Sequence, residues 1–432
     1  MVRVLRVYHG GRDPAHRARD RALVEAGVEL TTVLPAQWSE GGAEQRIGPE
    51  PFDVVELPVR RSGDSNRHGY ADPSALSRLV ARVRPDLVDL HEEPFSAVTR
   101  QWLGVVPASV PVVSYTAQNI DKRWPPPFAQ WETAALRRLA GVYPCSRQAA
   151  SVLRGKGYGG LLEVLPLGVD ATTLHAGDQR HDDPEWTLLL VGRLVPEKGV
   201  REAVEVLARV RKHRLARLVV VGRGPEGDGV PGLARELGVA DHVELVPWVD
   251  ATSLAALYRS AHVALLPSRT TRTWVEQFGR VITEGQASGT VVVGWASGSI
   301  PEVGAGLVPL APEGDVQALA DRVLELWADR ERYDDLRDRG LARAVELAWP
   351  EVGRQQAGFY ARALQQPVGL PLRPGRGAAE REFGPPAEVA GGGRPFALPV
   401  LREDTPVSRA LARGVDALGR LRRYPAVGSG GA

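Results

Sequence analysis

Short β-branched segments alternate with segments whose apolar residues recur at helical spacing, and this alternation occurs in two successive runs. Such a chain folds as α/β with mostly parallel sheets, because each helix returns the chain to the start of the next strand. In the first run we expect helices that begin at Asp72-Pro73, cover residues 128–139 and extend from Ser146 to Gly157. We expect its strands at residues 2–7, 28–34, 54–59, 87–90, 110–115, 142–143 and 162–165.

The second run starts at Thr187, and a Trp349-Pro350 break precedes its last helix, expected over residues 350–364. Two Rossmann-like halves place a ligand between them, at the carboxyl ends of their strands. We therefore expect two domains that face a central cleft. The other elements are expected as helices at residues 316–328 and 331–346, and as strands at 187–191, 217–221, 243–246, 263–266, 291–293 and 307–310.

The length of 432 residues is too great for one ordinary domain and suits two domains with a tail. The segment Pro166-Leu167-Gly168-Val169-Asp170, followed by polar residues, indicates a boundary between the domains. Because the composition shifts to Pro and Gly near the end, we expect a disordered tail there. The expected parts are a first domain at 1–167, a second domain at 168–349, a last helix at 350–366 and the tail at 367–432.

Residues 409–423 of the tail carry five Arg and one Asp, with Leu and Val at roughly helical spacing. This basic segment is suited to weak peripheral contact with an anionic membrane, but its two glycines and its lack of an aromatic anchor favour a solvated tail. The whole chain has 54 basic and 52 acidic residues, a balance that argues against a nucleic-acid partner. No apolar run reaches the ~18 residues of a membrane span, and no secretory segment begins the chain. We expect a cytoplasmic protein, peripheral to the inner face of the membrane if residues 409–423 bind lipid.

Cys145 is the one cysteine, which excludes an internal disulfide and a Cys-rich metal site. No His and Asp cluster shows metal-ligand spacing, and no Ser, His and Asp set has the spacing of a nucleophile elbow. We therefore expect no metal site and no cofactor.

The turn after the first strand of the second run reads GRLVPEKG, from Gly192 to Gly199, and leads into a helix. Its glycines allow a tight loop, the helix N-terminus offers free amides, and Arg193 and Lys198 add two positive charges. This arrangement is suited to an anion such as a diphosphate. The alternative is an exposed turn whose lysine contacts only solvent.

A nearby G-x-G-x-x-G occurs at Gly222, Gly224 and Gly227. We interpret it as a turn near a nucleotide, because it follows the second strand of its half.

A second loop, residues 272–280, precedes a helix that contains Glu284. If the helix begins at Phe278-Gly279, Glu276 lies in the loop and faces the cleft. Carboxylates there suit sugar and ribose hydroxyls, which they contact through both oxygens. The alternatives are a solvated helix carboxylate for Glu284 and an N-terminal dipole partner for Glu276.

Polar side chains also follow two strands of the first run. His91, Glu92 and Glu93 end one strand and are candidates for acid–base chemistry, with a structural histidine as the alternative. Gln118-Asn119 follows the next strand, where amides bind hydroxyl groups or form turns.

Taken together, these motifs resemble the retaining GT-B glycosyltransferases of family 4 (glycosyltransferase group 1) over about residues 1–365. The GR-x-x-x-EKG loop followed by Glu-x7-Glu is the most specific part of the resemblance. It is carried by the Gly10-Gly11 loop, DLVDLHEEPFS (86–96), YTAQNID (115–121), PLGVD (166–170), VGRLVPEKG (191–199), VGRGPEG (221–227) and WVEQFGRVITEGQASGTVVVGWASGSIPEVG (274–304).

The resemblance implies that the last helix, residues 350–366, crosses back to the first domain. It also implies a donor site and a catalytic set. Arg193 and Lys198 would bind the donor diphosphate, Glu284 the ribose and Glu276 the transferred sugar. The amides of Phe278, Gly279 and Arg280 would complete the site, and Gly10 and Gly11 would face the phosphate from the first domain. The expected catalytic residues are Glu276, Arg193, Lys198 and His91, and the remaining expected donor contacts are Gly192, Gln118 and Asn119.

One departure concerns the transferred sugar. Many members of the family have a histidine where this chain has Thr116. Gln118 or Asn119 is the expected replacement for that contact.

The resemblance implies transfer of a hexose from a UDP- or GDP-linked sugar to an acceptor hydroxyl, with retention and without a metal. The nucleotide sugar is a co-substrate, and the acceptor is open between a saccharide, a lipid-linked group and a small molecule. Attack on the face from which the diphosphate departs is favoured, because no placed nucleophile is evident. A nucleotide-sugar 2-epimerase and a catalytically silent nucleotide-sugar-binding scaffold are the alternatives.

Overall fold

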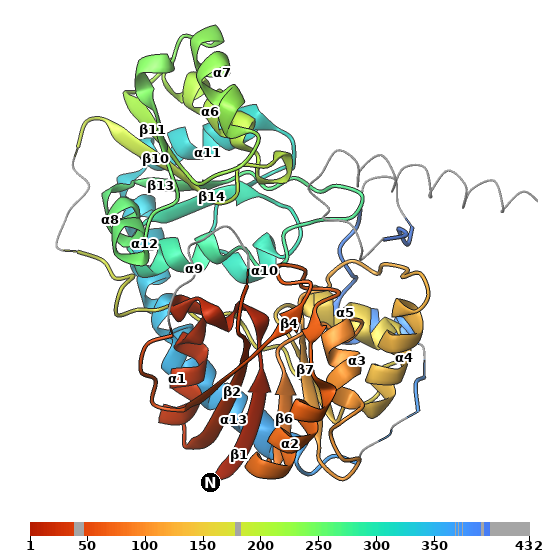
Figure 1. Cartoon of the computed structure of the whole chain (residues 1–432). Helices are drawn as coiled ribbons and strands as arrows, with labels where there is room; N and C mark the ends of the chain where they lie inside the picture. Colours follow the sequence, from red (N-terminus) through yellow and green to blue (C-terminus); the bar gives the residue numbers. More distant parts are fainter. Residues whose placement is uncertain are drawn as a thin grey trace, which may run out of the picture.

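The computed structural model describes residues 1–38, 47–177, 183–367, 369, 371–373, 375–389 and 393–397. Two α/β domains are stacked in Figure 1, the first (red to yellow) below the second (green to cyan). No helix in the described part of the chain combines the length and the apolar character needed to cross a bilayer.

The first domain is built on a parallel sheet with the strand order β3-β2-β1-β6-β7-β8-β9. The order reverses between β1 and β6, and ligands of doubly wound sheets bind at that position. β1 and β6 are largely buried because helices cover both faces of the sheet. The strands are β1 (Val2–Val7), β2 (Val28–Pro35), β3 (Asp53–Leu57), β6 (Leu87–Leu90), β7 (Val112–Thr116), β8 (Gly141–Pro144) and β9 (Leu161–Leu162).

Two helices of the first domain start at the caps that the sequence predicts. The Asp72 carboxylate accepts a hydrogen bond from the Ser74 amide, and the Ser146 hydroxyl accepts one from the Ala149 amide. The expected strand 54–59 is wrong in one respect, because β4 (Val59–Arg60) leaves the sheet and pairs antiparallel with β5 (Gly69–Tyr70). The helices are α1 (Ala18–Glu25), α2 (Pro73–Val83), α3 (Ala97–Leu103), α4 (Phe128–Arg138) and α5 (Arg147–Gly155), with short 3-10 turns at His9–Arg12 and Pro14–Arg17.

The second domain repeats the design with the strand order β12-β11-β10-β13-β14-β15, and its reversal lies between β10 and β13. Its strands are β10 (Trp186–Val191), β11 (Ala216–Val221), β12 (Val243–Val246), β13 (Val263–Leu266), β14 (Val291–Trp295) and β15 (Leu310–Ala311). Its helices are α6 (Val200–Val210), α7 (Val230–Glu236), α8 (Ala251–Ser260), α9 (Arg280–Ala287), α10 (Ile300–Gly304), α11 (Val316–Ala328) and α12 (Arg330–Glu346), with 3-10 turns at Pro196–Lys198, Gly227–Gly229 and Ala240–His242.

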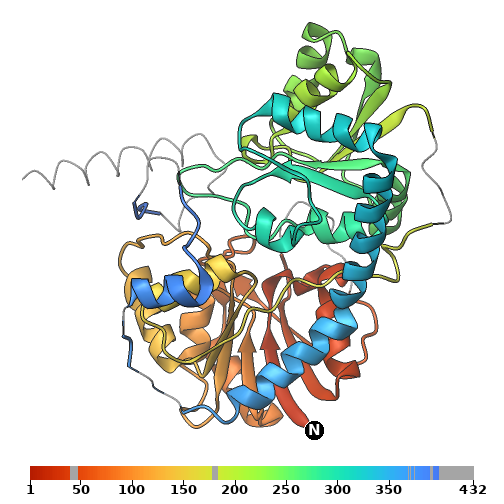
Figure 2. The ribbon, with the colours of Figure 1, turned by 180° about the vertical axis from the view of Figure 1, so that it is seen from behind.

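The helix α13 (Trp349–Ala363) returns from the second domain and crosses the back of the first, as Figure 2 shows. Gly353 permits its close approach to α1, since a Cβ atom there would lie 2.7 Å from the Ala22 backbone. Phe359 and Tyr360 join the apolar core of the first domain. The Tyr360 hydroxyl also donates to Asp89 Oδ2 at 2.7 Å. The first domain is therefore completed by the far end of the chain.

Part of the segment expected to be disordered is ordered, so that expectation is wrong there. The helix α14 (Arg376–Phe383) packs on α5, where Arg154 Nε lies 3.2 Å from a Glu382 carboxylate oxygen. Ala387 and Val389 then pack against Ile120 of the first domain and Val275 of the second. These apolar contacts explain the order in a Pro- and Gly-rich segment. Residues 409–423 lie outside the described residues.

Candidate active site

The loop expected to bind an anion connects β10 to α6. Lys198 ends the 3-10 turn Pro196–Lys198, and Gly199 follows at φ +67°, where α6 begins. A Cβ atom on Gly199 would lie 2.1 Å from the Pro267 carbonyl oxygen, so the loop requires glycine there. Arg193 is exposed at the start of the loop. The structure thus places two cations beside a helix N-terminus, as the sequence predicts.

The G-x-G-x-x-G turn packs against this loop. A Cβ atom on Gly222 would lie 1.9 Å from the Gly192 carbonyl oxygen, and one on Gly224 would lie 2.3 Å from that of Leu194. The Leu194 amide donates to the Arg223 carbonyl at 2.9 Å. The glycines therefore serve close backbone packing against the anion loop, in agreement with the interpretation as a turn near it.

Lys198 and Glu276 form an ion pair between the two predicted loops. Lys198 Nζ donates to Glu276 Oε2 at 2.7 Å, and the Ser268 hydroxyl donates to the same oxygen at 2.7 Å. Burial acts to raise the pKa of Glu276, but the attraction of Lys198 and these hydrogen bonds outweigh it and lower the pKa. Lys198 Nζ also lies 4.8 Å from the centre of the Trp274 ring. Glu276 is consequently held as a buried, charged carboxylate.

The sequence leaves open whether the helix α9 includes Glu276 or begins at Phe278-Gly279, and the structure shows the second arrangement. Gly279 caps it at φ +82°, which leaves Glu276 in the loop. Glu284 is buried on the helix, where its carboxylate accepts a hydrogen bond from the Tyr258 hydroxyl at 2.9 Å and lies 3.1 Å from Arg280 Nη2. Phe278 is buried in the apolar core, so its side chain supports the loop.

Contacts between the domains reach this loop. Asn119 Nδ2 donates to the Glu276 carbonyl oxygen at 2.9 Å. Gln277 Nε2 donates in return to the Ala117 carbonyl at 3.0 Å. Gln118, by contrast, has a hydrogen bond only within its own turn among the described contacts, from its amide to Thr116 Oγ1 at 3.1 Å. Of the two predicted amides, Asn119 is the one joined to the second domain.

The Gly10-Gly11 turn is linked to α9 by a residue that sequence reasoning missed. His16 Nδ1 lies 3.0 Å from the Gly10 carbonyl oxygen, and its Nε2 lies 3.4 Å from Arg280 Nη1. Burial and the nearby Arg280 charge lower the pKa of His16. Its only sequence signal is its position five residues after the glycines. The structure therefore brings Gly10 and Arg280 toward one site, as expected.

His91 lies apart from the ion pair. Its described ring contacts are all with tyrosines of the first domain, including stacking on Tyr115 at 4.2 Å and a hydrogen bond between Nδ1 and the Tyr143 hydroxyl at 3.0 Å. Burial lowers the pKa of His91 well below its usual value. This position suits a structural histidine, the alternative to the expected catalytic role.

Thr116 contacts a buried acid instead of pointing to the second domain. Its hydroxyl donates to Glu93 Oε2 at 2.6 Å, and the Ala117 amide donates to Glu93 Oε1 at 2.9 Å. Burial raises the pKa of Glu93 to about 7 despite these hydrogen bonds. The Thr116 hydroxyl is therefore bound to a carboxylate of its own domain.

Three side chains that could ligate a metal converge in the first domain. His9, His68 and Glu92 converge there, with one ligand atom of each within 4.8 Å of the others. Three distant segments supply them, so no spacing in the sequence indicates the group.

Comparison with known proteins relates both domains to glycosyltransferases. Residues 173–343 match the family model "Glycosyl transferases group 1", and residues 21–173 match the model "Glycosyltransferase Family 4". D-inositol 3-phosphate glycosyltransferase 2 of Catenulispora acidiphila is 32% identical over 228 residues, which are 48% of this chain and 52% of that protein. A GDP-mannose-dependent alpha-(1-6)-phosphatidylinositol monomannoside mannosyltransferase of Mycobacterium tuberculosis is 35% identical over 40% of this chain and 48% of that protein. The matches thus span about half the length of these relatives.

Solved structures share the fold. Sucrose-phosphate synthase from Thermosynechococcus elongatus superposes with a TM-score of 0.67 at 20% identity, over 84% of this chain and 100% of that one. HepE of Anabaena in complex with UDP-glucose superposes with a TM-score of 0.61 at 16% identity, over 84% of this chain and 99% of that one. At these identities the likeness concerns the fold, which is GT-B.

Proposed function

We propose that this chain, which has the GT-B fold and matches glycosyltransferase family models in both domains, transfers a hexose from a nucleoside-diphosphate sugar to an acceptor hydroxyl. The observation that carries the proposal is the 2.7 Å contact between Lys198 Nζ and Glu276 Oε2. It joins a cationic loop suited to a diphosphate with a carboxylate suited to sugar hydroxyls.

The charge that develops on the leaving diphosphate is met by this chain's own groups. Lys198 and Arg193 supply full positive charges, and the N-terminal amides of α6 supply partial charges. Preorganised donors of this kind stabilise the transition state because they need not reorient as the glycosidic bond breaks. The donor is thereby bound without a metal at the diphosphate.

Glu276 orients the sugar in this proposal. Its carboxylate is already engaged by Lys198 and Ser268, so it is poorly disposed to attack the anomeric carbon. We therefore favour attack of the acceptor on the face from which the diphosphate leaves, with retention of configuration. The leaving phosphate oxygen takes the acceptor proton.

Glu284 is assigned to the donor ribose, and Asn119 fixes the backbone of the sugar-binding loop from the first domain. The nucleotide is UDP or GDP. Relatives named for GDP-mannose and a neighbour solved with UDP-glucose support both choices, so the assay must decide between them.

A thermal-shift panel of the whole chain against UDP, GDP, ADP and their sugar conjugates tests the donor site. A ligand at 100 times its dissociation constant adds about 2.7 kcal/mol of stability. We expect one nucleotide family to raise the melting temperature equally with and without EDTA, and Glu284→Ala to abolish the rise. An absence of any nucleotide-dependent rise would overturn the donor assignment and favour the scaffold alternative.

Turnover separates the remaining alternatives. With the stabilising nucleotide sugar and a panel of acceptor alcohols, NMR of the product is expected to show the anomeric configuration of the donor. Release of an epimerised sugar without any acceptor would instead identify a 2-epimerase. An inverted product would exclude same-face attack.

A further inference from the structure

A second cluster of functional side chains lies in the first domain, at the carboxyl ends of β1 and β6. His9 lies two residues after β1, Glu92 lies two residues after β6, and His68 immediately precedes β5. One ligand atom from each lies within 4.8 Å of the other two. None of these atoms belongs to the Lys198 and Glu276 pair, so the cluster requires its own explanation.

The backbone fixes which nitrogen of His68 faces the cluster. His68 Nδ1 lies 3.1 Å from the Asp64 carbonyl oxygen, an acceptor, so Nδ1 carries the proton. In the neutral ring Nε2 then holds a lone pair, and it lies 4.0 Å from Glu92 Oε1. Two lone-pair atoms thus face each other beyond hydrogen-bond distance. A histidine anchored in this way through its other nitrogen is characteristic of a metal ligand.

The charge of Glu92 also calls for a cation. Its side chain is 2% exposed, and in the described part of the chain its ion-pair partners are His9 and His68, with neither Lys nor Arg within 4.0 Å. The His9 amide nitrogen lies 2.8 Å from Glu92 Oε1, and His9 Nδ1 lies 2.7 Å from Glu92 Oε2. A divalent ion bound between the three side chains would offset the charge of the buried carboxylate.

The distances suit an ion after small movements. His9 Nδ1 lies 2.7 Å and His68 Nε2 4.0 Å from Glu92 carboxylate oxygens. Ligands at about 2.0–2.2 Å from a tetrahedral ion lie roughly 3.3 Å apart, between these two values. Imidazole nitrogens with one carboxylate favour Zn²⁺ and similar transition ions over Mg²⁺ or Ca²⁺.

The Trp38 side chain lies beside the two histidines of the cluster. The Trp38 ring lies 4.8 Å from the His9 ring and 4.9 Å from the His68 ring. Its Nε1 atom is buried and has no hydrogen-bond acceptor among the described residues. An N–H donor of this kind beside the cluster suits an oxygen ligand, such as water, in the fourth position of the ion.

We propose that His9, His68 and Glu92 bind a divalent transition-metal ion of the Zn²⁺ type. The ion ties the segment between β4 and β5 to the carboxyl ends of β1 and β6. His9 directly precedes the Gly10-Gly11 turn, so this site borders the expected donor site, but its existence does not depend on the proposed transferase activity.

Metal binding to the whole chain tests this directly. Metal-free protein, prepared with EDTA and transferred to chelator-free buffer, is titrated with ZnCl₂ in a calorimeter. We expect one high-affinity site per chain, weakened in His68→Gln and Glu92→Gln by more than the roughly 10–100-fold attributed to outer-shell partners. His175→Gln, which changes an exposed histidine outside the cluster, should bind Zn²⁺ like the wild type. No uptake, or uptake that both cluster variants retain, would overturn the proposal.

Two wild-type measurements keep the test decisive if the buried variants fail to fold. Co²⁺ should give the intense visible absorption of a four- or five-coordinate site, and Zn²⁺ should abolish it by competition. Zn²⁺ should also slow amide hydrogen exchange at residues 59–70. Featureless Co²⁺ spectra together with unaltered exchange at 59–70 would rule the site out.

Discussion

Lys198 Nζ and Glu276 Oε2 are 2.7 Å apart although 78 residues separate them in the chain. The contact joins the loop after β10 to the loop before α9, at the edge where Asn119 of the first domain also binds. One pair of side chains thus couples the anion loop, the sugar loop and the opposite domain.

Replacing Lys198 by Met is expected to reduce kcat/KM by about 10²–10³-fold, since one preorganised charge is lost from the leaving-group site. Donor affinity should fall as well. The variant also leaves Glu276 buried without its cation, so stability should drop. Adding Glu276→Gln should restore stability but not donor binding. Lys212→Met, at an exposed lysine beyond α6, is the matched control in calorimetry and turnover assays. Full donor affinity in Lys198→Met would contradict the assignment.

The lowered pKa of Glu276 predicts a pH dependence of stability. A carboxylate whose folded pKa lies below its ordinary value of 4.5 stabilises the fold above that value. The contribution is lost as the pH falls through the folded pKa. Urea unfolding of the wild type and Glu276→Gln from about pH 3 to 7 should therefore show a stability difference that rises with pH and levels off above about 4.5. A difference independent of pH would show that folding leaves the pKa of Glu276 unchanged, and a difference that falls as the pH rises would show that folding raises it.

Gly224→Ala is expected to disturb the anion loop. The added Cβ atom would lie 2.3 Å from the Leu194 carbonyl oxygen, so the loop must move, and φ +156° disfavours alanine. Gly238→Ala is the control, because Gly238 has φ +70° but nothing within 4 Å of the added atom. Both variants should lose about 1 kcal/mol or more of stability, and only Gly224→Ala should weaken nucleotide binding. Equal nucleotide affinities in the two would show that the turn does not support the site.

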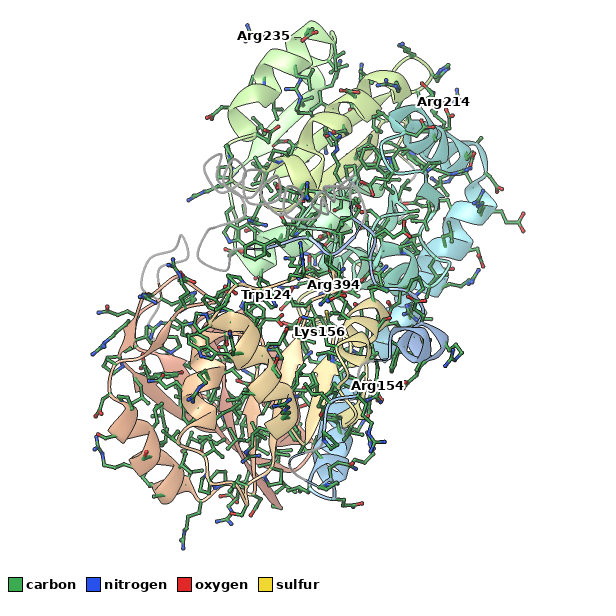
Figure 3. The ribbon with its side chains drawn as sticks, turned by 90° about the vertical axis from the view of Figure 1, so that its right-hand side faces the viewer. Trp124, Arg154, Lys156, Arg214, Arg235 and Arg394 are labelled. Atoms are coloured by element: carbon green, nitrogen blue, oxygen red, sulfur yellow. The ribbon has the colours of Figure 1, made fainter. Side chains whose placement is uncertain are left out.

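Truncation before α14 is expected to destabilise the contact between the two domains at Ile120 and Val275. A chain that ends at residue 375 lacks Ala387 and Val389, which cover Ile120 and Val275. Loss of this burial, with that of α14 on α5, should cost about 2 kcal/mol or more. A chain that ends at residue 397 keeps every described contact and is the reference in a melting experiment. Figure 3 labels Arg394 and Trp124 near the level where the domains meet. The reference keeps both residues, whereas the shorter chain lacks Arg394. Identical melting temperatures would show that the segment adds no stability.

The sequence predicts the elements that depend on local pattern. The loop with Lys198 and the spacing of Glu276 and Glu284 could be read directly, because a strand end, glycines and a helix start lie within a few residues of one another. The helix caps at Asp72 and Ser146 could be predicted for the same reason, because each side chain bonds an amide only two or three residues ahead.

Features assembled from distant segments could not be predicted in this way. His16 reaches Arg280 across 264 residues, and His68 meets Glu92 only because the start of β5 lies near the end of β6. The helix α14 was missed for a different reason. Its Pro- and Gly-rich flanks indicate disorder, and its order comes from packing on α5, which composition does not report.

The crossing of α13 has a consequence for how the chain is made. Phe359 and Tyr360 belong to the core that Val4 and Leu23 begin. A ribosome that has finished the first sheet has therefore not yet produced the residues that close its core. The strands of the second domain are contiguous from Trp186 to Ala311, so that domain can fold during synthesis before the first is complete. We therefore expect the second domain to complete its core before the first domain does.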